Sequence, residues 1–229
     1  MPRTRSVLLA LAVALAGLAG YLTAHTILTH TAHRHPASAL RNIRTPAAAV
    51  APAGWPEPVQ SLDGIPVGFA RTPRGAVAAC LNYLAALERA LLPGNPWSWA
   101  QVVRTLTAQP LRARALAGQA GSAQVQGQLA SARVFYLASW PLGYRLMSYA
   151  RASARVTVWT LGAMARPDGS VPATFSTTGC QLDWTGEDWK VAGASAAPGP
   201  TPPNAASSGA HVSAFVRAAS SFTTVRDVP

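Results

Sequence analysis

The chain is poor in the side chains that most often carry out acid–base chemistry. It has 8 acidic residues against 19 basic ones, and none of its 5 histidines lies within residues 69–196. Acid–base catalysis needs His, Asp or Glu side chains that converge in an apolar cavity. The acids of this region are few: Glu88, Asp168, Asp183, Glu187 and Asp188. We expect Glu88, which lies between Leu87 and Arg89, at the surface or paired with an arginine.

Signatures of nucleophilic catalysis and of metal binding are also absent. The chain has no G-x-S-x-G, and neither of its 2 cysteines has a histidine within residues 69–196 to activate it. Gly118 and Gly121 lack the lysine and the preceding strand of a phosphate-binding loop. No Cys/His cluster has the spacing of a zinc site. The sequence therefore predicts a protein that is not an enzyme and that needs no cofactor or metal.

Lysine is almost missing, although the formal net charge is +11. Lys190 is the one lysine, and the other basic residues are arginines. These arginines are scattered, with no block of five or six like charges. Nucleic-acid binding is therefore not predicted. A solvated basic surface that faces anionic lipid or cell-wall polymers is the simpler interpretation.

A long apolar run near the start predicts a membrane span. Residues 7–28, "VLLALAVALAGLAGYLTAHTIL", contain no Asp, Glu, Lys or Arg, and residues 1–6 carry two arginines. About 20 apolar residues in a helix cross a bilayer. A cleaved signal peptide is the alternative, with a small-residue site at residues 16–20. Because the apolar run continues past that site, we expect an uncleaved anchor, a cytoplasmic tail of residues 1–6 and an extracytoplasmic remainder.

The rest of the chain divides into a linker, a domain and a tail. Residues 29–67 are rich in Pro and Ala and predict a semi-extended linker. In residues 68–196, helical periodicity comes first, with Thr72 as the N-cap of the first helix, and strand-like segments follow. This order predicts an α+β fold in which about three helices pack on a curved antiparallel sheet of about four strands. Residues 197–229 are expected to be mostly disordered, apart from a possible short helix over residues 211–222.

The two cysteines, Cys80 and Cys180, are separated by 100 residues. In an exported domain they could form a disulfide. Both could equally be small buried apolar residues. The sequence alone leaves these alternatives open.

The segment "TTGCQLDWTGEDWKVA", residues 177–192, predicts a β-hairpin. Trp184 and Trp189 would face the core from its two strands. Residues 185–188 would form a polar turn. The principal interpretation is structural, and the second is that the hairpin presents a partner-facing surface. That surface would consist of Asp183, Glu187, Asp188 and Lys190.

Two segments carry a resemblance to a known family. They are "GIPVGFARTPRGAVAACLNYLAAL" at residues 64–87 and "LDWTGEDWKVAGA" at residues 182–194. With the span and linker, they resemble actinobacterial membrane-anchored proteins that carry a nuclear-transport-factor-2-like (cystatin-like) cone domain. These are similar to bitopic subunits of type IV secretion and to TcpC-type conjugation subunits. The resemblance covers residues 1–196, and Glu187 is an insertion in the family's W-x-G-D-W-[KR] hairpin.

The resemblance implies a non-enzymatic, single-pass subunit of the cell membrane that acts as an assembly scaffold in a conjugation or type IV secretion-like envelope complex. The expected partners are the membrane, further copies of the chain and other subunits of that complex. The alternative is an extracytoplasmic cone domain that binds a small ligand or, less in keeping with its few titratable groups, acts as an enzyme. A cleaved, secreted accessory protein is a third possibility.

Overall fold

The computed structural model describes residues 58–92, 94–117, 123, 126–127, 137–164, 170–204 and 207–225. The predicted cytoplasmic tail, the span at residues 7–28 and the linker up to residue 57 lie outside the described residues. Among the helices within them, none is long and apolar enough to cross a membrane.

The fold is α+β, with two antiparallel sheets. The larger sheet has five strands in the order β6-β5-β4-β3-β7. Its bounds are β3 Leu137–Ala150, β4 Ser153–Met164, β5 Ala173–Trp184, β6 Trp189–Pro198 and β7 Thr223–Thr224. Strands β3, β4 and β5 each pair with the next strand along the chain, and β7 returns to β3. The expected antiparallel sheet is therefore present, with one strand more than predicted.

A small hairpin precedes the first long helix, within the segment predicted as linker. Strands β1 (Gln60–Leu62) and β2 (Ile65–Val67) pair around Asp63 and Gly64, whose φ angles are 52° and 83°. Two positive φ values in a two-residue loop define the turn that Asp-Gly favours between paired strands. Because Ile65 and Val67 are buried in the core, the folded part begins before residue 68, contrary to the predicted boundary.

Helix α2 (Pro73–Arg89) is the central helix of the core. The Thr72 hydroxyl accepts the Gly75 amide at 3.0 Å, and Pro73 occupies the first helical turn, so the predicted start of this helix is confirmed. One face of α2 is buried against the sheet, where β4 and β5 supply alternate side chains. These are Ala154, Val156, Val158, Cys180 and Leu182.

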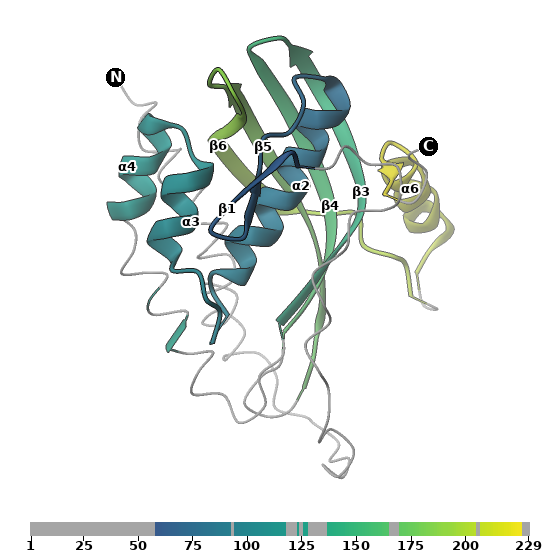
Figure 1. The fold of residues 1–229 in the computed structure, drawn as a ribbon. Helices are drawn as coiled ribbons and strands as arrows, with labels where there is room; N and C mark the ends of the chain where they lie inside the picture. The colour runs from purple at the N-terminus through teal and green to yellow at the C-terminus, as the bar shows by residue number, and fades with distance from the viewer. Residues whose placement is uncertain are drawn as a thin grey trace, which may run out of the picture.

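Two shorter helices continue the layer, with α3 beside α2 and α4 beside α3 (Figure 1). Helix α3 (Trp99–Leu106) begins at Ser98, whose hydroxyl accepts the Gln101 amide at 3.1 Å. Its side chains at Trp99, Val102, Val103 and Leu106 are buried, as an amphipathic helix requires. Helix α4 (Gln109–Ala117) follows directly, and the Ala108 amide between them donates to the Val191 carbonyl of β6 at 2.9 Å.

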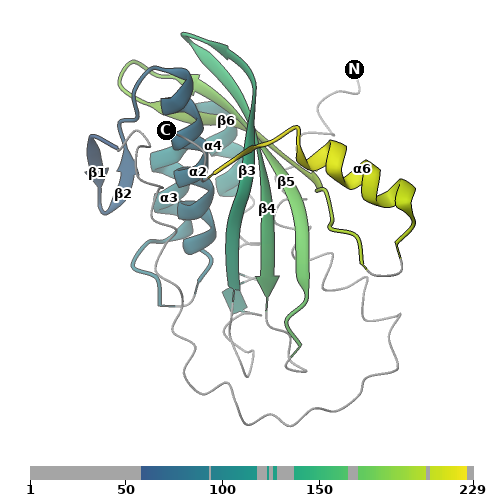
Figure 2. The same cartoon turned by 90° about the vertical axis from the view of Figure 1, so that its right-hand side faces the viewer.

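The C-terminal segment forms a helix on the opposite side of the sheet. Figure 2 shows the sheet between α2 and α6 (Gly209–Ala219). Phe215 of α6 and Phe222 after it lie with their ring centroids 6.2 and 5.9 Å from that of Trp159 on β4. Helix α6 confirms the short helix expected over residues 211–222. With strand β7 it replaces much of the predicted disorder after residue 197, and the two enclose aromatic surface on the second face of the sheet.

Candidate functional site

The hairpin of β5 and β6 closes one end of the sheet around two tryptophans. Trp189 is fully buried, while Trp184 is half-buried, and their rings meet edge to face with centroids 5.2 Å apart. The turn at residues 185–188 needs Gly186, whose φ is 91°. The Trp189 indole N–H donates to the Ala70 carbonyl at 3.0 Å. The tryptophans therefore join the hairpin to the segment that leads into α2.

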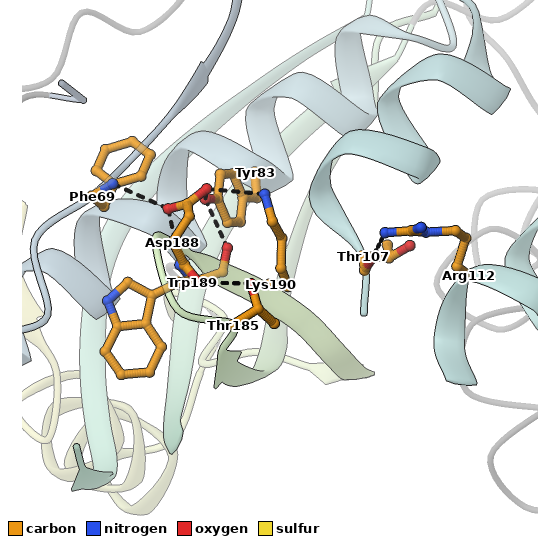
Figure 3. A network of polar contacts seen from close by, with 8 residues as sticks. All are labelled: Phe69, Tyr83, Thr107, Arg112, Thr185, Asp188, Trp189 and Lys190. Atoms are coloured by element: carbon orange, nitrogen blue, oxygen red, sulfur yellow. Dashed lines mark hydrogen bonds and ion pairs between the residues drawn. The ribbon is translucent and has the colours of Figure 1, made fainter. Parts of the chain in front are cut away.

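Asp188 does not lie at the surface, as the partner-facing interpretation required. It is 5% exposed, and its carboxylate points into the protein (Figure 3). One oxygen, Oδ1, accepts the backbone amides of Phe69 at 3.1 Å and of Trp189 at 2.9 Å. The other, Oδ2, accepts the Tyr83 hydroxyl at 2.7 Å and the Lys190 ammonium at 3.1 Å. Asp188 thus ties α2, β6 and the segment before α2 together.

Lys190 does not point away from the protein either. Its ammonium forms an ion pair with Asp188, and its side chain is 17% exposed. The lysine therefore compensates the charge of the Asp188 carboxylate. Without it, the carboxylate would be a buried charge with no counter-charge, which lowers stability.

Tyr83 is a fully buried member of this network. Its hydroxyl donates to Asp188 and lies 2.9 Å from the Trp189 carbonyl. Desolvation raises the pKa of Tyr83 far above its ordinary value, and the charge and hydrogen bond of Asp188 act in the same direction. The phenol therefore stays protonated and acts as a donor, which suits a structural role.

The surface at this end of the sheet mixes charges instead of being acidic. Glu187 is exposed and Asp183 is partly exposed, so these two remain available to a partner. Beside them, the Arg71 guanidinium lies 5.3 Å from the ring centroid of Trp184 and donates through Nε to the Arg151 carbonyl at 2.7 Å. A partner at this end would meet cations and carboxylates together.

Glu88, expected at the surface or paired with an arginine, is half-buried. It lies near the end of α2, and its carboxyl group is hydrogen-bonded to Ser139 of β3. Burial raises the pKa of Glu88 to about 7, although the hydrogen bond to Ser139 acts in the opposite direction. This carboxyl group therefore titrates near neutral pH.

Cys80 and Cys180 are joined by a disulfide between α2 and β5. Cys80 lies one helical turn before Tyr83, so the covalent link and the Asp188 network fasten the same face of α2 to the same end of the sheet. Among the residues that the structure describes, no three His, Cys, Asp or Glu side chains gather as ligands for a metal ion.

The comparisons with known proteins identify the family. The chain belongs to the DUF8175 family, a domain of unknown function. The family's model matches residues 24–213, which include the hairpin, α2 and the disulfide. No curated protein matches the chain. Among solved structures, it is similar to the intermembrane space region of the chloroplast protein ARC6, with 12% identity over 56% of this chain and 97% of that one and a TM-score of 0.39. That score is too low to transfer a fold or a function.

Within this DUF8175 domain, sequence reasoning missed Tyr83 and the backbone of Phe69 as partners of Asp188. A signal for Tyr83 does exist. It lies one turn after Cys80 on a largely apolar helix, and a buried phenol hydroxyl needs an acceptor. The Phe69 amide carries no comparable signal, because every residue but proline has one.

Proposed function

We propose that this chain is a non-enzymatic, membrane-anchored subunit of a conjugation or type IV secretion-like envelope complex, and that its extracytoplasmic domain acts as an assembly scaffold. The observation that supports it best is the state of Asp188. All four of its contacts are with protein donors, so its charge is used to fasten elements together. A domain that positions partners needs this rigidity.

The disulfide supports the extracytoplasmic location. Bonds of this kind persist in oxidising compartments and are rare in the cytosol. The anchor at residues 7–28 is the second element of the proposal, and it would leave the described domain outside the cell membrane.

We further propose that the domain is a nuclear-transport-factor-2-like cone. Helices α2, α3 and α4 follow the small β1–β2 hairpin, and the long antiparallel strands come after them and curve behind α2 (Figure 1). This order and the helix cover on one face are what the family resemblance implies.

Cross-linking in the cell tests the scaffold. The tagged full-length protein would be cross-linked, purified from membranes and analysed with its adducts by mass spectrometry. We expect copies of the chain together with a transfer ATPase or other channel subunits. Charge reversal at the exposed Glu187 should remove adducts at the hairpin end, whereas Ser148→Lys, on a different exposed strand edge, should not. Recovery of the monomer alone would contradict the proposal.

One observation favours the alternative, a ligand-binding domain. Glu88 is a half-buried carboxyl group whose pKa is raised to about 7, and groups with strongly shifted pKa values gather at functional sites. Native mass spectrometry of the protein purified from its own membranes would detect a retained small molecule. If Glu88 binds it, the molecule should be lost from Glu88→Gln and retained by the exposed variant Glu187→Gln.

A further inference from the structure

The two edges of the large sheet differ in how they are closed. Along β3, strand β7 pairs with Gly143 and Tyr144, and the pairing of β3 with β4 shifts register twice. Pro141 and Arg145 lie on either side of the segment that β7 covers. Proline, charge and register shifts are the devices by which proteins keep an edge strand from pairing with another chain.

The edge at β6 has such protection along its first residues and at its last residue, Pro198, but not between them. The Val191 carbonyl accepts the Ala108 amide, and Thr107 forms a bridge to Val191, so the connection between α3 and α4 covers this part. Residues 193–197 read Gly-Ala-Ser-Ala-Ala and contain no charge and no proline. Within the described part of the chain, no strand pairs with their outer edge. An uncharged, partly exposed edge of this kind accepts another strand.

Residues 193–197 have small side chains, and the nearest charge on the strand is paired, so this edge can pair with the same edge of a second copy of the chain. Neighbouring strands lie about 4.8 Å apart, and Gly, Ala and Ser allow that approach on both faces. Identical edges can pair antiparallel about a two-fold axis, because each contact is then made twice. The nearest charge on β6 is Lys190, which Asp188 already compensates at 3.1 Å. With an axis near Ser195, the two Lys190 residues would be about 33 Å apart along the strands, well beyond the screening length of about 8 Å.

We propose that two copies of this chain pair through residues 193–197 of β6, antiparallel, to make one continuous sheet. This inference rests on the proposed scaffold function and locates its self-association. A ladder this short is weak between free molecules. Anchoring both copies in one membrane would raise their effective concentration and favour the pair.

A cysteine scan in the full-length, membrane-bound protein tests the pairing. The only two cysteines are bonded to each other, so each introduced cysteine is the single free thiol. Cysteines at residues 193–197 in turn would be oxidised, and the disulfide-linked dimer would be measured. We expect a maximum at one or two positions, because a residue two places from the axis lies about 13 Å from its copy, beyond the 4.4–6.8 Å that a disulfide spans.

The matched control is Ser148→Cys, an exposed serine on β3 at the other edge of the sheet, which should give no dimer. Equal dimer at every position of the scan and at Ser148→Cys would mean random collision and would overturn the proposal. A disulfide to a different protein would also overturn it.

Charge variants give a second, independent test. Ser195→Lys and Ser195→Glu, introduced without any added cysteine, should each abolish the adduct between two copies in the in-cell cross-linking experiment, while co-expression of the two should restore it between the unlike copies. Dimer that persists with either charge alone would contradict the pairing. If in-cell cross-linking finds other subunits but these variants show no effect, the scaffold function stands and this interface fails; absence of any neighbour would refute the scaffold itself.

Discussion

Replacing Asp188 by alanine tests whether the buried carboxylate holds the domain together. Its two oxygens accept four hydrogen bonds, and the substitution removes all of them. The Phe69 amide would then be buried without this acceptor. The Tyr83 hydroxyl would keep the Trp189 carbonyl, 2.9 Å away. Removing one partner of a buried ion pair costs about 3–5 kcal/mol. Because Lys190 is 17% exposed and can reach water, we expect the lower end, about 3 kcal/mol.

Asp188→Asn gives a second loss in the free energy of unfolding with which the loss for Asp188→Ala can be compared. The amide oxygen can still accept the backbone amides of Phe69 and Trp189, whereas its NH2 group faces the Lys190 ammonium and cannot pair with it. We therefore expect a smaller loss, about 1–2 kcal/mol. The difference between the two variants would measure how much the two backbone contacts contribute.

Urea unfolding at pH 7, followed by tryptophan fluorescence with the disulfide intact, measures these losses. Trp189 is fully buried beside Asp188 and reports on the same region. Glu187→Ala is the matched control, since this exposed carboxylate precedes Asp188 in the same turn, and exposed substitutions usually stay within about 0.5 kcal/mol. A loss below about 1 kcal/mol for Asp188→Ala, or an equal loss for both residues, would refute the reasoning.

Three further predictions concern other parts of the domain. Because the pKa of Glu88 is raised, the folded state holds a proton that the unfolded state releases, and the free energy of unfolding should fall as the pH rises from about 4.5 to 7, by at most about 3 kcal/mol. Glu88→Gln should flatten that slope in unfolding curves measured across this pH range. Replacing both Cys80 and Cys180 by serine opens a loop of about 100 residues and should cost about 4–5 kcal/mol, measured by unfolding with and without reductant; no loss would contradict a bonded pair. Phe215→Ala removes a ring contact with Trp159 and should speed proteolysis between residues 199 and 222 while leaving the sheet intact; unchanged cleavage would show that α6 is held by other contacts.

Local features of the fold could be predicted from the sequence, because their causes lie within a few residues. The Thr72-Pro73 pair starts α2, and the hydroxyl that caps it is three residues from the amide it accepts. Alternation in the hairpin likewise predicted that Trp184 and Trp189 face the core, and Trp189 is fully buried while Trp184 is half-buried. These signals do not depend on how the chain closes.

Features that depend on distant contacts could not be predicted in this way. Asp188 lies in a polar turn, which is typical of exposed residues, yet its donors Phe69 and Tyr83 are 119 and 105 residues away in the chain. It is buried only because α2 and the segment before it close over the hairpin. The short helix expected over residues 211–222 is present as α6, but its partner Trp159 of β4 lies more than 50 residues earlier and was not identified. Composition after residue 197 indicated disorder because proline dominates its start.

Lys190 takes part in the buried network of Asp188 and lies on β6, the strand of the proposed pairing. The network and the pairing can still be separated by experiment. Replacing Asp188 by asparagine leaves the Lys190 charge uncompensated in each copy. Two such charges about 33 Å apart along a shared ladder, screened over about 8 Å, should not repel appreciably. Provided that Asp188→Asn folds, it should therefore lower the free energy of unfolding and leave the dimer formed by Ser195→Cys unchanged. A lost dimer in a folded Asp188→Asn protein would mean that Lys190 lies at the interface and that the two-fold axis is nearer to it than residues 193–197.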